Sequence, residues 1–213
     1  TMKRLVDYSL YLCTDRELMT SKTLEECVER AILGGVTCVQ LREKQASSLE
    51  FYEEAKRVLQ ITKTYGVPLI INDRVDIALA IDADGVHIGQ SDLPANEVRR
   101  LLGKEKIVGV SARNVKEALE AYKAGADYLG VGAMFSTSTK TDAEVVSKEE
   151  LKNIQQKVNL PIVLIGGMNA RTIPEFLSFK VQGFAVVSAI VSEKNVTHAA
   201  QELKKIISSF GCR

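Results

Sequence analysis

Short runs of apolar and β-branched residues alternate with longer stretches of helical periodicity along the whole of this chain. Eight such runs can be recognised: "YSLYLC", "TCVQL", "VPLII", "DGVHI", "KIVGV", "DYLGV", "LPIVLI" and "GFAVV". Runs of this length, bounded by turn residues, are typical of strands. Spread over 213 residues they define units of about 27 residues, which suits a strand followed by a helix. The alternation predicts an α/β fold.

Eight strand–helix units favour a closed (β/α)8 TIM barrel, and we expect residues 1–213 to form a single barrel domain. The alternative is an open doubly wound sheet, which would normally carry a glycine-rich turn after its first strand. Here the first strand leads into "TDRELMTS", which has no glycine. Gly34 and Gly125 each follow a helical stretch, and we expect them to end those helices in the left-handed backbone conformation.

The overall charge excludes some classes of partner. The formal net charge is +1, so the chain has no global field that would attract nucleic acid or an anionic membrane. No apolar run approaches the length of a membrane span, and the first ten residues lack the apolar core of a signal peptide. We therefore expect a cytoplasmic protein with small-molecule partners. A homo-oligomer is compatible with the sequence, which does not give the oligomeric state.

The stretch "VQLREK" shows how polar residues gather where the strands end. In a strand the side chains alternate, so Gln40, Arg42 and Lys44 share one side, opposite to Val39 and Leu41. Because the site of a TIM barrel lies at the C-terminal ends of its strands, we expect these three polar side chains to point into the barrel mouth. Two cations there would repel each other unless negative charge lies between them.

Two aspartates could supply that negative charge. Asp73 follows the third apolar run, and Asp92 follows the fourth within a few residues. They could simply neutralise the cations as an ion-pair network. The alternative is that they hold Mg²⁺ while the cations bind a phosphate-rich ligand, since Mg²⁺ is usually bound by carboxylates together with substrate phosphates.

Other residues carry weaker signals. Gly166 and Gly167 after the seventh run, with Ser188 after the eighth, suit a second phosphate site, although a glycine pair could also be only a tight turn. The segment "AMFSTSTKTDAEV" is long and polar, and we expect it to act as a lid. Several residues are expected to be structural: His87 as a core histidine with a satisfied ring, His198 as a surface residue, Tyr8, Tyr11 and Tyr128 as packing residues, and "EFYEEAKR" as a solvated helix face.

Seven motifs together closely resemble the thiamine-phosphate synthase family, in the expected order from about Tyr8 to Ile207. They are "VQLREK", "IINDRVDIAL", "DGVHIGQSD", "VGVSA", "GAMFSTSTK", "IGGM" and "VVSAI". The resemblance implies a (β/α)8 barrel. It also implies a transferase that joins 4-amino-5-hydroxymethyl-2-methylpyrimidine diphosphate to 4-methyl-5-(2-phosphooxyethyl)thiazole, giving thiamine phosphate and diphosphate.

The resemblance also implies roles for individual residues. The pyrimidine diphosphate would contact Gln40, Arg42, Lys44, Asn72, Ser111 and Lys140. Within that set the catalytic side chains would be Arg42, Lys44, Ser111 and Lys140. The implied cofactor is Mg²⁺, bound by Asp73 and Asp92. The thiazole phosphate would be held by Thr137, Thr139, Gly167, Val187 and Ser188.

The chain departs from the family pattern in two places. Ala133, Ser136 and Ser138 replace residues of a loop that commonly reads G-P-x-F-x-T-x-T-K, and Arg113 stands where a histidine is frequent. A thiazole tautomerase-like barrel is an alternative, but that branch tends to lose the diphosphate and metal residues. A non-catalytic thiazole phosphate-binding protein is a second alternative, and another phosphate-handling barrel such as an isomerase or epimerase is a third.

Overall fold

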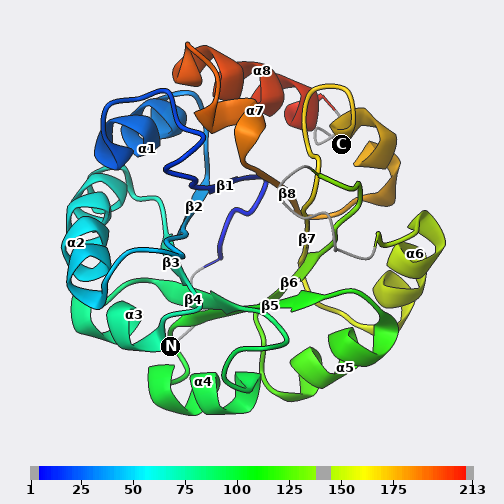
Figure 1. Ribbon diagram of the computed structural model, residues 1–213. Helices are drawn as coiled ribbons and strands as arrows, with labels where there is room; N and C mark the ends of the chain where they lie inside the picture. Colours follow the sequence, from blue (N-terminus) through cyan, green and yellow to red (C-terminus); the bar gives the residue numbers. More distant parts are fainter. Residues whose placement is uncertain (1–4, 138–144, 210–213) are drawn as a thin grey trace.

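Eight parallel strands close into a barrel in the computed structural model, which describes residues 5–137 and 145–209 (Figure 1). The strands are β1 (Leu10–Cys13), β2 (Cys38–Leu41), β3 (Leu69–Asn72), β4 (Gly85–Ile88), β5 (Ile107–Ala112), β6 (Tyr128–Val131), β7 (Ile162–Leu164) and β8 (Gly183–Val186). Each pairs with the next, and β1 also pairs with β8, where Leu12 lies opposite Val186. The (β/α)8 barrel is therefore confirmed, and the open doubly wound sheet is excluded.

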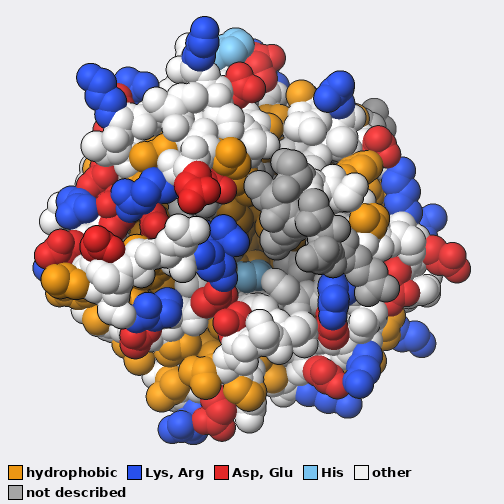
Figure 2. Space-filling model, viewed as in Figure 1, with side chains coloured by type: hydrophobic (Ala, Val, Ile, Leu, Met, Phe, Trp, Pro, Cys, Tyr) orange, Lys and Arg blue, Asp and Glu red, His pale blue; other side chains and the backbone are white. Residues whose placement is uncertain are grey.

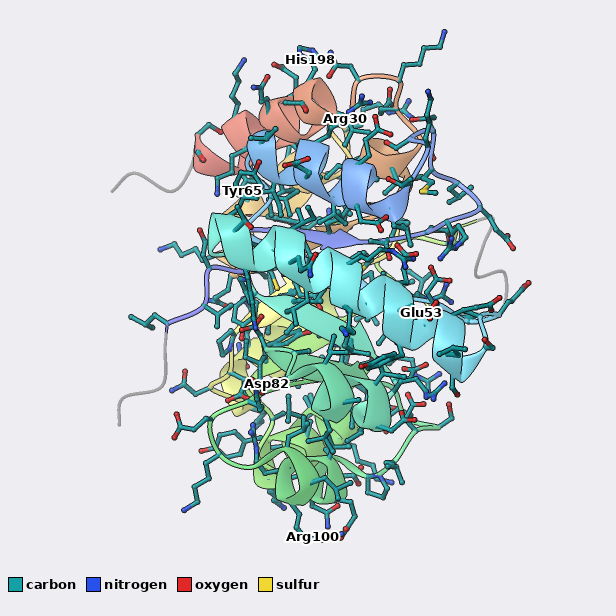
Figure 3. All side chains as sticks on the ribbon, turned by 90° about the vertical axis from the view of Figure 1, so that its left-hand side faces the viewer. Arg30, Glu53, Tyr65, Asp82, Arg100 and His198 are labelled. Carbon is teal, nitrogen blue, oxygen red and sulfur yellow. The ribbon has the colours of Figure 1, made fainter. Side chains whose placement is uncertain are left out.

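The helices form a ring around the barrel. They are α1 (Leu24–Leu33), α2 (Ser48–Tyr65), α3 (Val75–Ile81), α4 (Ala95–Leu102), α5 (Val115–Lys123), α6 (Lys148–Lys157), the 3₁₀ helix η1 (Ile173–Phe179), α7 (Ser188–Val191) and α8 (Val196–Ser208). Seen from the side, they flank the strands, and His198 lies on the outer surface as expected (Figure 3). Within the described residues, no helix combines the length and the apolar character that crossing a membrane requires.

Alternation along each strand divides the buried residues into two clusters. On β2, Val39 and Leu41 belong to the large outer cluster between the strands and the helices. Cys38 belongs instead to the smaller cluster inside the barrel, and Gln40 also faces inward, where it bonds to Tyr11. The inner cluster contains Tyr8, Tyr11, Cys13, Cys38, Ile70, Ile107, Tyr128, Val163 and Ala185. The barrel interior is thus filled by side chains, as in other barrels of this size.

The helix ends follow the expected capping rules with one correction. Gly125 has a φ of +88° and follows α5, as predicted. After α1 the residue with positive φ is Gly35, at +114°, whereas Gly34 keeps a right-handed helical conformation. Position 34 requires a glycine for another reason, because a Cβ there would overlap the backbone oxygen of Thr197 on α8. The glycine pair therefore combines a helix stop with close helix packing.

The same kind of side-chain to backbone hydrogen bond occurs four times on the N-terminal face of the barrel. At four places the residue just before an even-numbered strand accepts a backbone N–H from the strand before it. The pairs are Thr37 with Leu10, Asp84 with Leu69, Asp127 with Val108, and Gln182 with Ile162. Each satisfies a backbone donor at the start of a strand. This face thus contributes to stability, which leaves the opposite face for chemistry.

Replacement of Asp127 should test the stabilising role of this face. Its carboxylate accepts from Val108 N at 2.8 Å and pairs with the Arg99 guanidinium at 2.5 Å. Because the bond to a charged acceptor is lost on a partly buried face, Asp127→Ala should lower the free energy of unfolding by about 2 kcal/mol. Urea denaturation measures this. Glu202→Ala, which removes a surface ion pair with Lys205, is the control and should leave the free energy of unfolding nearly unchanged, because the pair is exposed.

Candidate active site

A cavity of about 1300 Å³ opens at the C-terminal ends of the strands. Residues from all eight strands or the loops after them line it, as the barrel rule predicts. In the space-filling view, basic and acidic side chains lie next to one another around a hollow near the centre of this face (Figure 2). Nine of the predicted site residues line this cavity: Gln40, Arg42, Lys44, Asn72, Ser111, Thr137, Gly167, Val187 and Ser188.

The two predicted metal ligands, Asp73 and Asp92, are not among the residues that line this cavity, but each directly follows one that does (Asn72 and Ser91), and they lie close to each other at its edge. Asp73, directly after β3, forms an ion pair with Lys44 and has a left-handed φ of +62°. Asp92 accepts a hydrogen bond from Gly89 N at 2.7 Å. Burial, together with a side-chain hydrogen bond to Asp73 and the like charge of that carboxylate, raises the pKa of Asp92, although the bond from Gly89 N opposes the shift. The structure therefore joins a cation from the β2 loop to two carboxylates from the β3 and β4 loops.

This pair of carboxylates fits a divalent cation. A carboxylate whose neighbour is a second carboxylate is a site where positive charge is stabilising. Among residues 5–137 and 145–209, no group of three or more His, Cys, Asp or Glu side chains is arranged to hold a metal alone. A site with two carboxylates is typical of Mg²⁺, which takes its remaining ligands from water and substrate phosphate.

Beneath the charged rim, a continuous chain of hydrogen bonds crosses the barrel interior. Asn72 Nδ2 donates to Gln40 Oε1 at 2.9 Å, and Gln40 Nε2 donates to the Tyr11 hydroxyl at 2.7 Å. The Tyr11 and Tyr128 hydroxyls are 2.6 Å apart. The ring of His87 joins Tyr128 to Ser111, with Nδ1 2.9 Å from the tyrosine oxygen and Nε2 2.8 Å from the serine Oγ. We call these six residues the polar chain.

Two glycines inside strands make room for the polar chain. A Cβ at Gly109 on β5 would overlap the ring of Tyr128. A Cβ at Gly130 on β6 would lie 2.9 Å from Cε1 of His87. Glycine within a strand often marks the close approach of another group, and here that group is a polar ring. These glycines were the sequence signal that could have identified Tyr128 and His87 as part of the site.

The structure therefore corrects the expectation that the tyrosines only pack. Tyr8 does pack, with its ring centroid 4.7 Å from that of Tyr128. Tyr11 and Tyr128 are buried but also line the cavity and belong to the polar chain. His87 has both ring nitrogens hydrogen-bonded, as expected, yet it too lines the cavity.

A second correction concerns "EFYEEAKR" on α2, which is only partly a solvated face. Glu54 is 6% exposed and bonds to Arg57 at 2.8 Å and to Arg16 at 3.5 Å. Arg16 also bonds to Glu43 at 3.0 Å. These residues line the side of the cavity next to the β2 loop. Periodicity alone did not reveal them because an arginine from the β1 loop folds over this turn of α2.

The far side of the cavity is formed by the loops after β6, β7 and β8. Gly166 and Gly167 have φ of +98° and +71°, and Thr172 Oγ1 donates to Gly167 O at 2.7 Å. Val187 is half-buried, and Ser188 begins α7. Thr137 lines the cavity, whereas the predictions for Thr139 and Lys140, and the lid predicted around them, fall in 138–144, outside the described residues.

Comparisons with known proteins agree with this geometry. The model of the family described as thiamine monophosphate synthase matches residues 10–190. A thiamine-phosphate synthase of Clostridium botulinum is 58% identical over 204 residues, covering 96% of each chain. One from Clostridium beijerinckii is 58% identical over 203 residues, covering 95% of this chain and 97% of the relative. The solved structure of a thiamine phosphate pyrophosphorylase from Pyrococcus furiosus has a TM-score of 0.88 and 41% identity, covering 96% and 97%.

Gly167 offers a test of how tightly the β6 and β7 loops are joined. A Cβ there would lie 2.9 Å from Cβ of Phe135, and the positive φ adds strain. Gly66 has nearly the same φ, +68°, but a Cβ there would meet nothing within 4 Å. We expect Gly66→Ala to cost about 1 kcal/mol of unfolding free energy and Gly167→Ala to cost clearly more. Equal losses in urea denaturation would show that the Phe135 contact is unimportant.

Proposed function

The chain belongs to the thiamine monophosphate synthase family and is a transferase with that family's activity; we propose how the side chains at the mouth of its barrel divide the reaction. The pyrimidine diphosphate loses its diphosphate, and the ring nitrogen of the thiazole phosphate takes its place on the methylene carbon. The products are thiamine phosphate and diphosphate. The observation that carries this assignment of roles is the cluster in which Lys44, Asp73 and Asp92 meet beside the polar chain.

The central task is to stabilise charge on the departing diphosphate. Arg42 and Lys44 line the cavity, and Lys140 would add a third cation from the β6 loop. Mg²⁺, held by Asp73 and Asp92, would neutralise the leaving group when bound. Lys44 is ion-paired with Asp73 here, so its ammonium is already positioned at the rim. Fixed cations that require no reorganisation as charge develops are the usual source of such rate enhancement.

No general base is required, because the thiazole ring nitrogen is itself a nucleophile. The structure does place Ser111 within 2.8 Å of His87, a pair that sequence analysis did not anticipate. The group behind the histidine is the Tyr128 hydroxyl, not a carboxylate. The pair therefore lacks the orienting anion of a serine-nucleophile triad, and we assign Ser111 to binding the pyrimidine.

The thiazole phosphate is assigned to the opposite side of the cavity. Thr137, Gly167, Val187 and Ser188 line it, and Thr139 lies in the same loop by sequence. The loops after strands seven and eight commonly bind phosphate in this fold. Holding the phosphate there would orient the ring nitrogen toward the methylene carbon, which is an entropic contribution to catalysis.

The cellular setting follows from the same proposal. All described helices and strands belong to one barrel, which supports a single domain over 1–213. Both substrates are small, charged, phosphorylated molecules, which favours a cytoplasmic enzyme without nucleic acid or membrane partners. The nearly balanced charge of +1 is in keeping with that.

The deciding experiment is incubation of the protein with both substrates, with and without Mg²⁺, while diphosphate release and thiamine phosphate are measured. We expect both products only when both substrates and the metal are present. Release that does not depend on metal would refute the role of the two aspartates. A protein that binds the thiazole phosphate but forms no product would be a binding protein.

Asp92→Asn tests the metal site within that assay. The amide keeps the shape of the side chain but loses the charge that Mg²⁺ requires, so turnover should fall by a factor of about 100 or more. Asp76→Asn is the matched control, because Asp76 pairs with Arg74 on the exposed face of α3. It should stay within about twofold of the parent. Near-normal turnover of the Asp92 variant at limiting Mg²⁺ would exclude Asp92 as a ligand.

A further inference from the structure

The polar chain connects two parts of the proposed substrate site, and its bonds have a definite order. It begins at Asn72 and ends at Ser111, both of which line the cavity. The links between them come from β2, β1, β6 and β4, so it crosses the barrel interior. The following inference rests on the proposed function, because it assigns the polar chain a role in binding the pyrimidine.

Each link of the chain has a limited number of protons. Burial raises the pKa of Tyr11 and of Tyr128 well above the usual tyrosine value, so each hydroxyl keeps its one proton. Gln40 Nε2 donates to the oxygen of Tyr11. Either hydroxyl could be the donor in the 2.6 Å bond that follows; donation by Tyr11, whose oxygen already accepts from Gln40, is the direction that gives every proton along the polar chain a partner.

The same reasoning continues to the serine. In that arrangement Tyr128 accepts from Tyr11 and donates its own proton to Nδ1 of His87, 2.9 Å away. A histidine that accepts at Nδ1 carries its single ring proton on Nε2. That proton is donated to Ser111 Oγ at 2.8 Å. The serine then has its own proton left to donate into the cavity.

We propose that the polar chain runs in one direction, from Asn72 to Ser111, and that Tyr11, Tyr128 and His87 are positioning residues that hold the Ser111 hydroxyl as a hydrogen-bond donor to the pyrimidine ring. The acceptor is a ring nitrogen of the aminopyrimidine, which offers a lone pair. Asn72 Oδ1 at the other end is an acceptor and suits the exocyclic amino group. The chain thus recognises a neutral aminopyrimidine by one donor and one acceptor.

The direction of the chain also has a consequence for catalysis. Positive charge develops on the pyrimidine as the diphosphate leaves, and a charged imidazole beneath the ring would oppose it in a low-dielectric interior. A chain whose histidine accepts from Tyr128 and donates to Ser111 places no formal charge there. It also keeps Ser111 from being deprotonated by His87, so the serine does not compete with the thiazole as a nucleophile.

The barrel is shaped to hold this chain. His87 is 8% exposed, and both tyrosines are almost completely buried, so their hydroxyls have little access to water as an alternative partner. Gly109 and Gly130 provide the space for the Tyr128 and His87 rings. An ordinary packing cluster would not need two strand glycines next to polar rings.

Nitrogen NMR can determine the position of the histidine proton directly. The protein has only two histidines, so labelling with ¹⁵N-histidine gives two sets of ring signals. The variant His198→Gln, on the surface of α8, assigns them. In the protein without substrate we expect His87 to be neutral, with its proton on Nε2. A proton on Nδ1, or on both nitrogens, would overturn the proposal, because the chain would then run the other way or end at the imidazole.

Tyr128→Phe tests the consequence for substrate binding, and Tyr8→Phe is its matched control. Both remove a hydroxyl from rings that contact each other in the inner cluster, but only Tyr128 belongs to the polar chain. In the ¹⁵N spectrum of Tyr128→Phe, the ring proton of His87 should no longer be confined to Nε2. It should also lower kcat/KM for the pyrimidine diphosphate by about tenfold or more, while KM for the thiazole phosphate stays within about twofold.

The ¹⁵N-histidine spectra and the kinetics of the two tyrosine variants together separate this inference from the proposed function. Equal effects of Tyr128→Phe and Tyr8→Phe, or equal losses for both substrates, would overturn the positioning role in an active enzyme. Thermal melting shows whether each variant is folded, and the tautomer of the parent protein decides the direction of the chain even if Tyr128→Phe is unstable. Failure of the parent to make thiamine phosphate would refute the function and leave the measured tautomer standing.

Discussion

Closure of the sheet between β1 and β8 is the constraint on which the rest of the structure depends. In a closed parallel barrel all eight strands end at the same edge, so short polar segments far apart in sequence meet around one opening. Alternation along each strand then sends every second side chain inward. Lys44, Asp73 and Asp92 come together for this reason, although each follows a different strand or loop.

The two faces of the barrel have different roles, one in stability and the other in the proposed chemistry. On the N-terminal face, residues such as Asp84 and Asp127 satisfy backbone donors and hold neighbouring strands together. On the C-terminal face, carboxylates lie close to each other, and Asp73 adopts a left-handed backbone conformation. Such costs are tolerated at functional sites because the surrounding fold is stable enough to impose them. The stability of one face thus permits the electrostatic cost on the other.

The interior is more polar than a barrel needs for packing. Apolar residues such as Cys38, Ile70 and Val163 belong to the inner cluster, but the hydrogen bonds of the polar chain cross the same interior. A hydrogen-bonded but uncharged layer can recognise a heterocycle without adding charge to it. The rim can then concentrate cations and carboxylates on the phosphate groups. The site therefore separates recognition of the ring from neutralisation of the leaving group.

The sequence by itself determined the eight units, the barrel and most of the residues around its mouth, because strand alternation and strand ends are local patterns. The rim aspartates and the β7 glycines were predictable in the same way. Only the tertiary structure decided that Tyr11, Tyr128 and His87 form one hydrogen-bonded chain, since they lie on three strands and read locally as packing residues. It also decided that Glu54 is buried by arginines, one of them from another loop. Such contacts depend on which side chains meet across the barrel, and periodicity along one segment carries no information about its distant neighbours.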